Sequence, residues 1–147
     1  MNLADLLATT SSAHPKKVAL ISMTDGSKVT FGEFQREADR VAGALVAAGI
    51  APGDRVAIGM PNIAHFAYAY FGILRAGAVV VPLHVMLTEP ETRAILEDSG
   101  ARAVMTAGPF AETAEAAAAS GPAVKLVVTP ERWQELGDHD VPAAIGG

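Results

Sequence analysis

Four short apolar runs recur along this chain at nearly constant intervals. They cover Arg55 to Gly59, Val79 to Val81, Arg102 to Thr106 and Val124 to Val128, so their starts lie 24, 23 and 22 residues apart. Helical patterns fill the intervals, and strands that alternate with helices at this spacing are typical of βαβ units. Because such crossovers are right-handed, the sequence predicts an α/β fold with a mostly parallel sheet covered by helices on both faces.

Each intervening helix has its own start and stop signals. The first is expected to begin at Asn62, whose side chain would cap the first free amides and so fill the place of an anion, and to end at Gly77. In the second, Thr88 and Glu91 have the spacing of a capping box, and Gly100 closes the helix. An alanine-rich third helix is expected over residues 109–119. The expected apolar face of the first helix consists of Ile63, Phe66, Tyr70, Ile73 and Leu74, and that of the second of Ile95 and Leu96.

A hairpin precedes the alternating part of the chain. Val18 to Ile21 and Lys28 to Phe31 flank the pair Asp25-Gly26, which suits a tight turn because glycine adopts positive φ without strain. Upstream of the hairpin, residues 3–10 are expected to form a short docking helix whose apolar face carries Leu3, Leu6 and Leu7.

A longer helix is expected directly after the hairpin. Thr30 and Glu33 have the spacing of a capping box, and the helical pattern runs to about Ala48, where Gly49 provides the stop. The apolar residues at helical spacing, which predict the buried stripe, are Phe31, Phe34, Ala38, Val41, Leu45 and Ala48.

Composition restricts the function classes. Hydrophobic residues make up 50% of the chain and charged residues only 18%, against roughly 25% charged in an average soluble domain, which indicates a surface that packs against further protein. The formal net charge is −5 and the 11 basic residues are scattered, so nucleic-acid binding is disfavoured. With no cysteine, the chain offers no disulfide, thiol nucleophile or thiolate metal site.

One stretch is long enough to raise the question of a membrane span. Residues 56–74 contain no Asp, Glu, Lys or Arg, but the segment Gly59 to Asn62 divides them, which favours burial in a folded domain. The N-terminus carries Asp5 and has neither a basic region nor a long apolar core typical of a secretion signal. We therefore expect a cytoplasmic protein without a transmembrane segment.

The sequence contains few signatures of chemistry. It has no G-x-x-x-x-G-K-[ST], G-x-G-x-x-G or G-x-S-x-G motif. The stretch most similar to a nucleotide site is Gly49 to Asn62, where a turn leads into a strand and then a helix start. We interpret its glycines, prolines and Asn62 as residues that end and begin elements of the fold, not as a nucleotide site. No metal, cofactor-binding or catalytic residue is therefore assigned.

Histidines provide the remaining candidates. His14, His65, His84 and His139 lie too far apart in sequence for a paired metal motif, and His65 is expected to be partly exposed. Only His84 lies just past a predicted strand, Val79 to Val81, and Pro82, at the edge where open α/β sheets bind ligands. A structural role is the simpler interpretation. The run Asp138 to Asp140 is typical of a solvated loop.

Eight segments between about Leu3 and Thr106 resemble, in order and spacing, the opening of the adenylate-forming superfamily of acyl-CoA synthetases and luciferases. Each segment is weak alone, and their succession carries the resemblance. They are Pro15-x-x-Val-Ala-Leu-Ile21, Val29-Thr-Phe-Gly-Glu-Phe34, Ala42-x-x-Leu-x-x-x-Gly49, Pro52-Gly-Asp-Arg-Val-Ala-Ile58, Met60-Pro-Asn62, Gly72-Ile-Leu-x-Ala-Gly-Ala78, Val81-Pro-Leu83 and Leu96-Glu-Asp-Ser-Gly100.

The resemblance implies the N-terminal part of a fatty-acid–CoA ligase-like enzyme. In that family the phosphate loop and the other catalytic segments match nothing in these 147 residues, so no catalytic residue is carried over. The family often has Pro-Leu-Asn where this chain has Pro82-Leu83-His84, and the following Val85-Met86-Leu87 lacks the basic residue with which some relatives reach CoA. A CoA contact from this loop is therefore not expected.

These observations support one hypothesis for the function and leave two alternatives open. Residues 1–136 are expected to form the N-terminal portion of an AMP-binding domain, with one or two helical turns over 130–136, and residues 137–147 a loop or linker. The resemblance implies ATP, Mg and CoA as cofactors of a parent enzyme that activates a carboxylic acid, with the remainder of that enzyme or a second copy as partner. The two alternative hypotheses are a free-standing, non-catalytic interaction module and a small α/β domain that binds a ligand near His84.

Overall fold

The computed structural model of the chain describes residues 2–120, 123–133 and 135–137. The expected linker over 137–147 therefore lies outside the described residues, except for Gly137. The helices are α1 (Leu3–Ala13), α2 (Phe31–Ala47), α3 (Ala64–Arg75), α4 (Glu89–Ser99), α5 (Ala111–Ala119), the 3-10 turn η1 (Gly108–Phe110) and the single turn α6 (Pro130–Trp133). The strands are β1 (Val18–Ile21), β2 (Lys28–Thr30), β3 (Arg55–Gly59), β4 (Val79–Pro82), β5 (Ala103–Thr106) and β6 (Leu126–Val128).

The four expected β-rich runs form one sheet in the order β4-β3-β5-β6, and each neighbouring pair is parallel. Arg55 pairs with Val79, and Val56 with Ala103, so the strands begin at nearly the same level. β5 and β6 start one and two residues later than the sequence pattern indicates. The predicted α/β class and the parallel sheet of βαβ units are confirmed.

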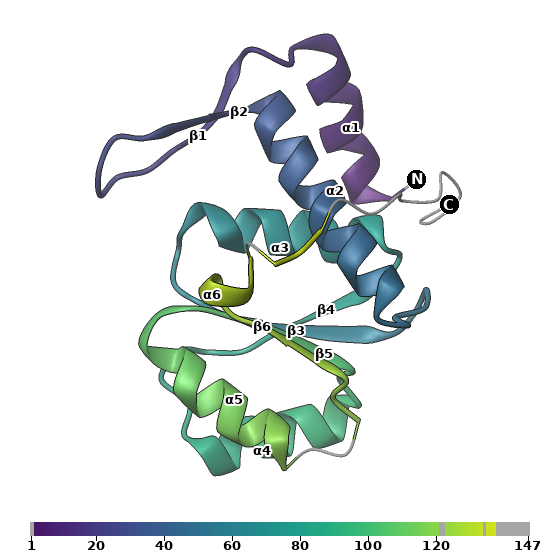
Figure 1. The fold of residues 1–147 in the computed structure, drawn as a ribbon, viewed down its shortest axis with the longest axis vertical. Helices are drawn as coiled ribbons and strands as arrows, with labels where there is room; N and C mark the ends of the chain where they lie inside the picture. Colours follow the sequence, from purple (N-terminus) through teal and green to yellow (C-terminus); the bar gives the residue numbers. More distant parts are fainter. Residues whose placement is uncertain (1, 121–122, 134, 138–147) are drawn as a thin grey trace.

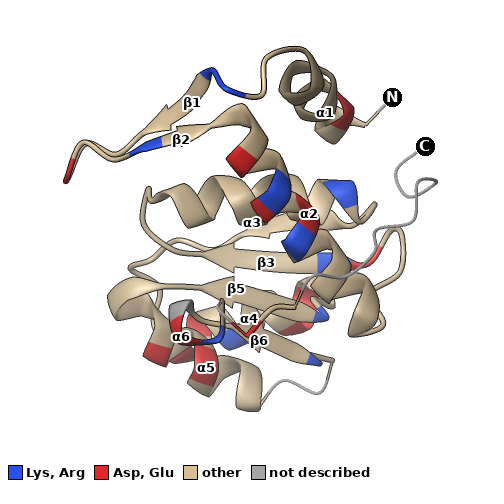
Figure 2. Cartoon of the chain, turned by 45° about the horizontal axis from the view of Figure 1, so that its top comes forward, with Lys and Arg blue, Asp and Glu red and all other residues tan. Residues whose placement is uncertain are grey.

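Helices cover both faces of this sheet (Figure 1). Side chains alternate across it: Val56 and Ile58 join the core beneath α2 and α3, while Ala57 joins the core beneath α4 and α5. Neighbouring β5 follows the same rule, with Met105 on the first face and Val104 on the second. Most charged residues lie on the helices and loops. Lys28 and Arg55 are the first residues of β2 and β3, and the centres of β3 and β5 carry no charge (Figure 2).

The hairpin β1-β2 forms a separate antiparallel sheet that projects beside α2 (Figure 1). Its turn is closed by two bonds, from the Gly26 N–H to the Ser22 carbonyl oxygen at 2.9 Å and from the Ser22 N–H to the Ser27 carbonyl oxygen at 2.8 Å. Gly26 has φ 71°, as expected, whereas Asp25 keeps a negative φ and accepts the Ser27 N–H at 3.0 Å. The turn is therefore longer than a two-residue Asp-Gly turn.

The long helix after the hairpin forms as predicted. Thr30 and Glu33 make both bonds of the capping box, and Gly49 adopts φ 90° just past the end of the helix. Its stripe is buried at Phe34, Ala38, Val41 and Leu45, and only partly buried at Phe31 and Ala48, the two ends.

The first helix docks differently from the expectation. Leu7 is buried, but Leu3 and Leu6 are 47% and 54% exposed, so the predicted three-leucine face is wrong. Instead Asn2 provides a capping box with Asp5, and its side-chain amide donates to the Leu74 carbonyl oxygen. The buried residues of α1 are Ala4, Leu7 and Ser11, and the Ser11 hydroxyl donates to the Phe31 carbonyl oxygen at 3.1 Å. The helix therefore packs through one leucine, two small side chains and polar bonds.

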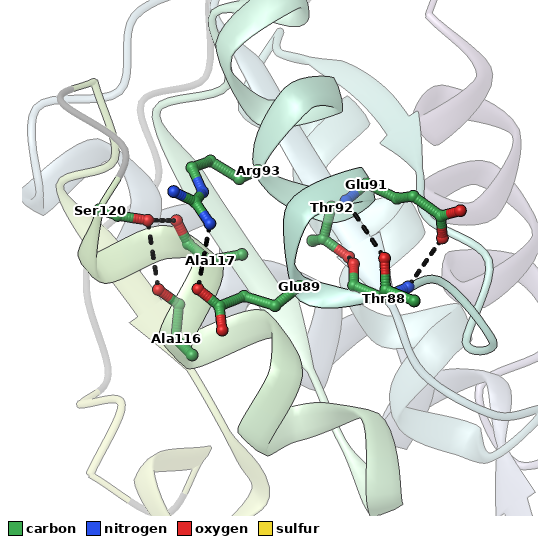
Figure 3. Close-up of polar contacts among 8 residues, drawn as sticks. All are labelled: Thr88, Glu89, Glu91, Thr92, Arg93, Ala116, Ala117 and Ser120. Atoms are coloured by element: carbon green, nitrogen blue, oxygen red, sulfur yellow. Dashed lines mark hydrogen bonds and ion pairs between the residues drawn. The ribbon is translucent and has the colours of Figure 1, made fainter.

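The second capping box opens α4 as predicted. The Thr88 N–H donates to Glu91 Oε2 at 2.8 Å, and the buried Thr92 hydroxyl returns a 2.8 Å bond to the Thr88 carbonyl oxygen (Figure 3). Gly100 ends the helix in the left-handed region at φ 67°. On the neighbouring α5, Ser120 donates to the carbonyl oxygens at the end of its own helix (Figure 3).

Candidate functional site

The carboxyl ends of β3, β4 and β5 meet at one edge of the sheet, where open α/β sheets bind ligands. Here that edge is filled by the chain's own apolar side chains. Met60, Leu83, Ala107 and Phe110, which follow the three strands, are all at most 6% exposed.

Gly59 shows how closely this edge is packed. A Cβ placed on it would lie 2.4 Å from Cε1 of Phe110 and 3.2 Å from Cβ of Leu83. The Thr106 hydroxyl, itself buried, donates to the Gly59 carbonyl oxygen at 2.8 Å. The absence of a side chain at this position therefore makes room for the Phe110 ring.

The helix start that follows β3 differs from the expectation. Ile63, not Asn62, is the N-cap of α3, and it makes no side-chain cap bond. The Ile63 N–H donates to the Pro61 carbonyl oxygen at 2.8 Å, which turns the chain at Asn62 and moves the helix start one residue along. The prediction that Asn62 caps the first amides is wrong, and Asn62 is exposed.

The buried face of α3 also differs. The predicted face contained Ile63, Phe66, Tyr70, Ile73 and Leu74, of which only Ile73 is buried. The residues that pack inward are Tyr68, Ala69, Gly72 and Ile73. Small side chains allow α3 to approach α2 closely, and a pattern of large apolar residues does not detect them.

His84 lies just beyond β4, as expected, and is exposed. Its Nδ1 accepts the N–H of Met86 at 3.1 Å, and its carbonyl oxygen accepts the N–H of Leu87 at 3.1 Å. These bonds build a local turn that leads into α4. Within the described residues, no group of three or more His, Asp or Glu side chains is placed to hold a metal ion; Asp138 to Asp140, with His139, lie outside them.

The Pro52-Gly53-Asp54-Arg55 segment lies at the opposite edge, where the strands begin. Asp54 Oδ2 accepts the Ala51 N–H at 2.8 Å and Nη1 of Arg102 at 3.1 Å. The pKa of the Asp54 carboxyl is lowered, first because Ala51 donates to it and then because the Arg102 guanidinium lies beside it. The Arg55 guanidinium donates to the Ser99 carbonyl oxygen. The segment therefore joins the starts of β3 and β5 and the end of α4.

A groove of about 380 Å³ lies between the hairpin and the start of α3. Its walls are mostly apolar and include Leu20, Val29 and Phe66, while Ser22, Ser27 and Asn62 contribute polar atoms. Ile21 and Met23, at its rim, are 59% and 97% exposed. The sequence indicated an apolar surface from composition but did not locate this groove.

The described part of the chain is therefore a parallel α/β scaffold with a flanking hairpin, whose strand-end edge is closed by its own side chains. The sequence profile of the family described as AMP-binding enzyme matches residues 7–144, and the chain belongs to this family. The resemblance to adenylate-forming enzymes is thereby confirmed. No helix of the described residues is both long and apolar enough to cross a membrane.

Two curated relatives illustrate the similarity. The chain is 35% identical over 115 residues to the long-chain-fatty-acid–CoA ligase FadD13 of Mycobacterium tuberculosis, an alignment that covers 78% of this chain and 23% of that protein. It is 37% identical over 121 residues to the fatty acid–[acyl-carrier-protein] ligase ScoC of Streptomyces coeruleorubidus, covering 82% and 23%. The chain thus spans about a quarter of the length of these relatives.

Solved structures show the same fold. The chain matches the N-terminal domain of FACL13 from Mycobacterium tuberculosis with a TM-score of 0.88 and 30% identity, over 98% of this chain and 38% of that one. It matches a benzoate CoA ligase from Burkholderia xenovorans LB400 with a TM-score of 0.84 and 31% identity, over 99% and 30%. This chain therefore covers less than half of each of these two structures.

Proposed function

We propose that this chain is the N-terminal scaffold portion of an ATP-dependent acid–CoA ligase, which activates a fatty or related carboxylic acid as an acyl-adenylate and transfers the acyl group to CoA. The observation that carries the proposal is that the chain aligns along 78% of its length with a fatty-acid–CoA ligase and spans only 23% of it. Residues 1–136 would be part of the AMP-binding domain, and residues 137–147 would lead to the next segment.

ATP, Mg and CoA are proposed for the whole enzyme only. The strand-end edge does not fit a nucleotide, because Phe110 occupies the space over Gly59. Among the described residues, no group of three or more carboxylate and histidine side chains is placed to bind a metal ion. The Lys and Arg side chains that would meet phosphates are also absent from the loop over 82–88. We therefore derive no catalytic step from these residues.

The contribution of this chain is mechanical support. The Asp54–Arg102 pair fixes the starts of β3 and β5, and the Thr106–Gly59 bond fixes their ends, so the sheet offers a rigid wall. The proposed partner of this chain is the remainder of the enzyme. We also propose that the enzyme is cytoplasmic. ScoC acts with an acyl-carrier protein by its name, so a carrier protein is the alternative acceptor.

One observation favours a second candidate function. Ile21, Met23 and Ile63 leave apolar surface exposed around the groove between the hairpin and α3. A free-standing, non-catalytic interaction module would use such a surface to bind another protein.

Detection of the native protein with an antibody against these 147 residues separates the two functions. The ligase proposal expects a polypeptide several times this length that catalyses pyrophosphate exchange dependent on a carboxylic acid. A native protein of 147 residues without exchange activity, bound to another protein, would support the interaction module and reject the ligase proposal.

A further inference from the structure

The single turn α6 is held to the body of the protein by one aromatic residue. Trp133 is only 4% exposed although it comes from a helix of four residues. Its Nε1–H donates to Oε2 of Glu37 on α2 at 3.0 Å, across 96 positions of sequence. Figure 1 shows α6 just after β6 and beside α3.

His65 on α3 completes the contact. Its ring lies 4.8 Å from the Trp133 ring, centroid to centroid, at an interplanar angle of 82°, and 5.6 Å from the Tyr68 ring. Tyr68 is in turn 6.2 Å from Trp133. The imidazole is therefore packed between two aromatic rings from two helices, and it is only partly exposed.

Each element that packs against His65 carries ionisable groups, but only those of α2 and α3 line its cleft. Glu33, Glu37 and Arg40 on α2 line the same cleft of about 450 Å³, with Arg40 Nη1 at 3.6 Å from Glu37 Oε1. From α3 comes Tyr68, whose pKa is raised, chiefly by burial. On α6, Glu131 and Arg132 are exposed and lie outside the cleft lining.

We propose that His65, Trp133 and Glu37 form a pH-sensitive clasp, which holds α6 against α2 and α3 while His65 is neutral and weakens when His65 takes up a proton. An imidazolium needs hydration that two aromatic neighbours do not supply, so it gains by turning towards solvent, and Trp133 then loses a ring contact. This clasp is independent of the proposed ligase activity.

The direction of the effect follows from linkage. The pKa of His65 is lowered because burial disfavours its charged form, and the Glu37 carboxylate offsets part of that effect. The unfolded or released state therefore binds the proton more tightly than the clasped state. The clasp is fully stabilised above the ordinary histidine pKa of about 6.5 and is lost progressively as the pH falls from there towards the lowered value.

The chain's one tryptophan makes the test specific, because all indole emission reports on Trp133. Emission wavelength and acrylamide quenching are measured on the 147-residue chain from pH ~7.5 to ~5. We expect a shift to longer wavelength and stronger quenching as the pH falls. His65→Phe keeps the ring contact but cannot titrate, so its emission should stay constant, while His84→Asn, at an exposed histidine, should titrate as the unmodified chain does.

Several results would overturn the clasp. They are emission that does not depend on pH, the same titration in His65→Phe, or a loss of intensity without increased acrylamide access. Loss of far-ultraviolet circular dichroism at the same midpoint would show global unfolding and would also reject it. If His65→Phe does not fold, His65→Gln provides the second non-titrating variant, and a pH response that persists there rejects the clasp.

Discussion

Gly72 and Val41 meet where α3 crosses α2, and a Cβ placed on Gly72 would lie 2.4 Å from Cβ of Val41. The Ala38 carbonyl oxygen would be 2.9 Å away on the same side. Since backbone and branched carbons cannot yield as a flexible side chain does, Gly72→Ala should force the helices apart and destabilise the fold by about 1–3 kcal/mol. Urea denaturation measures this, with Glu97→Ala on the exposed side of α4 as the control.

An unchanged midpoint for Gly72→Ala would mean that α2 and α3 are less closely packed than the structure shows.

The crossing of α2 and α3 also gives a physical reason for the Gly72-Ile-Leu-x-Ala-Gly-Ala78 segment. Gly72 allows the close approach, Ile73 fills the core, and Gly77 ends the helix at φ 75°.

Gly26 is the opposite case, because no atom lies within 4 Å of a Cβ placed there, yet its φ is 71°. Gly26→Val should therefore cost about 1 kcal/mol or more from backbone strain alone. Gly26→Asn is the matched control, since asparagine tolerates the left-handed region and should cost less. Equal denaturation midpoints for the valine variant and the unmodified chain would contradict the turn geometry.

The sequence was informative where a rule depends on local chemistry. The capping boxes Thr30–Glu33 and Thr88–Glu91 and the closing glycine Gly100 were all predicted correctly. These signals act within one helical turn, so no knowledge of the tertiary fold is needed. The regular spacing of the strands likewise predicted the parallel sheet.

Sequence reasoning failed where burial depends on what a helix packs against. The inward face of α3 contains Ala69 and Gly72, which carry little hydrophobic signal, while Phe66 is only partly buried beside the hairpin groove. The groove and the Trp133–Glu37 bond join residues from distant parts of the sequence. Neither leaves a periodic pattern that a single sequence could show.

Leu45 is 1% exposed on the stripe of α2 and belongs to the core beneath that helix. Leu45→Ala should destabilise the fold by about 2–5 kcal/mol, because it removes buried carbon atoms and leaves a cavity. The exposed Arg36 on the same helix supplies the control, and Arg36→Ala should change stability little. Thermal or urea denaturation measures the stability of both variants. Wild-type stability in Leu45→Ala would show that this stripe of α2 is not packed in the core.

Asp54 should make stability depend on pH in the acid range. Its pKa is lowered in the folded state, by the Ala51 N–H first and Arg102 next, so its contribution is present above the unfolded pKa of about 3.9 and disappears as the pH falls through the folded value. Asp54→Asn should thus lower the urea midpoint at neutral pH, and the difference from the unmodified chain should shrink in strong acid. A difference that stays constant across this range would exclude the charge as its cause.

The isolated 147-residue chain should neither catalyse acyl-adenylate formation nor bind Mg-ATP tightly. Stabilising charge on a transferring phosphoryl group requires amide donors, cationic side chains or a metal held within bonding reach. At the strand ends, Phe110 fills the space over Gly59, and His84 uses its Nδ1 to accept the Met86 N–H. Carboxylate-dependent exchange of labelled pyrophosphate, tested across several acyl chain lengths, should therefore stay at background, and calorimetry with Mg-ATP should show no saturable heat. The purified parent enzyme is the positive control for both measurements. Clear exchange by the pure chain would reject the scaffold role and would require a nucleotide site within these residues.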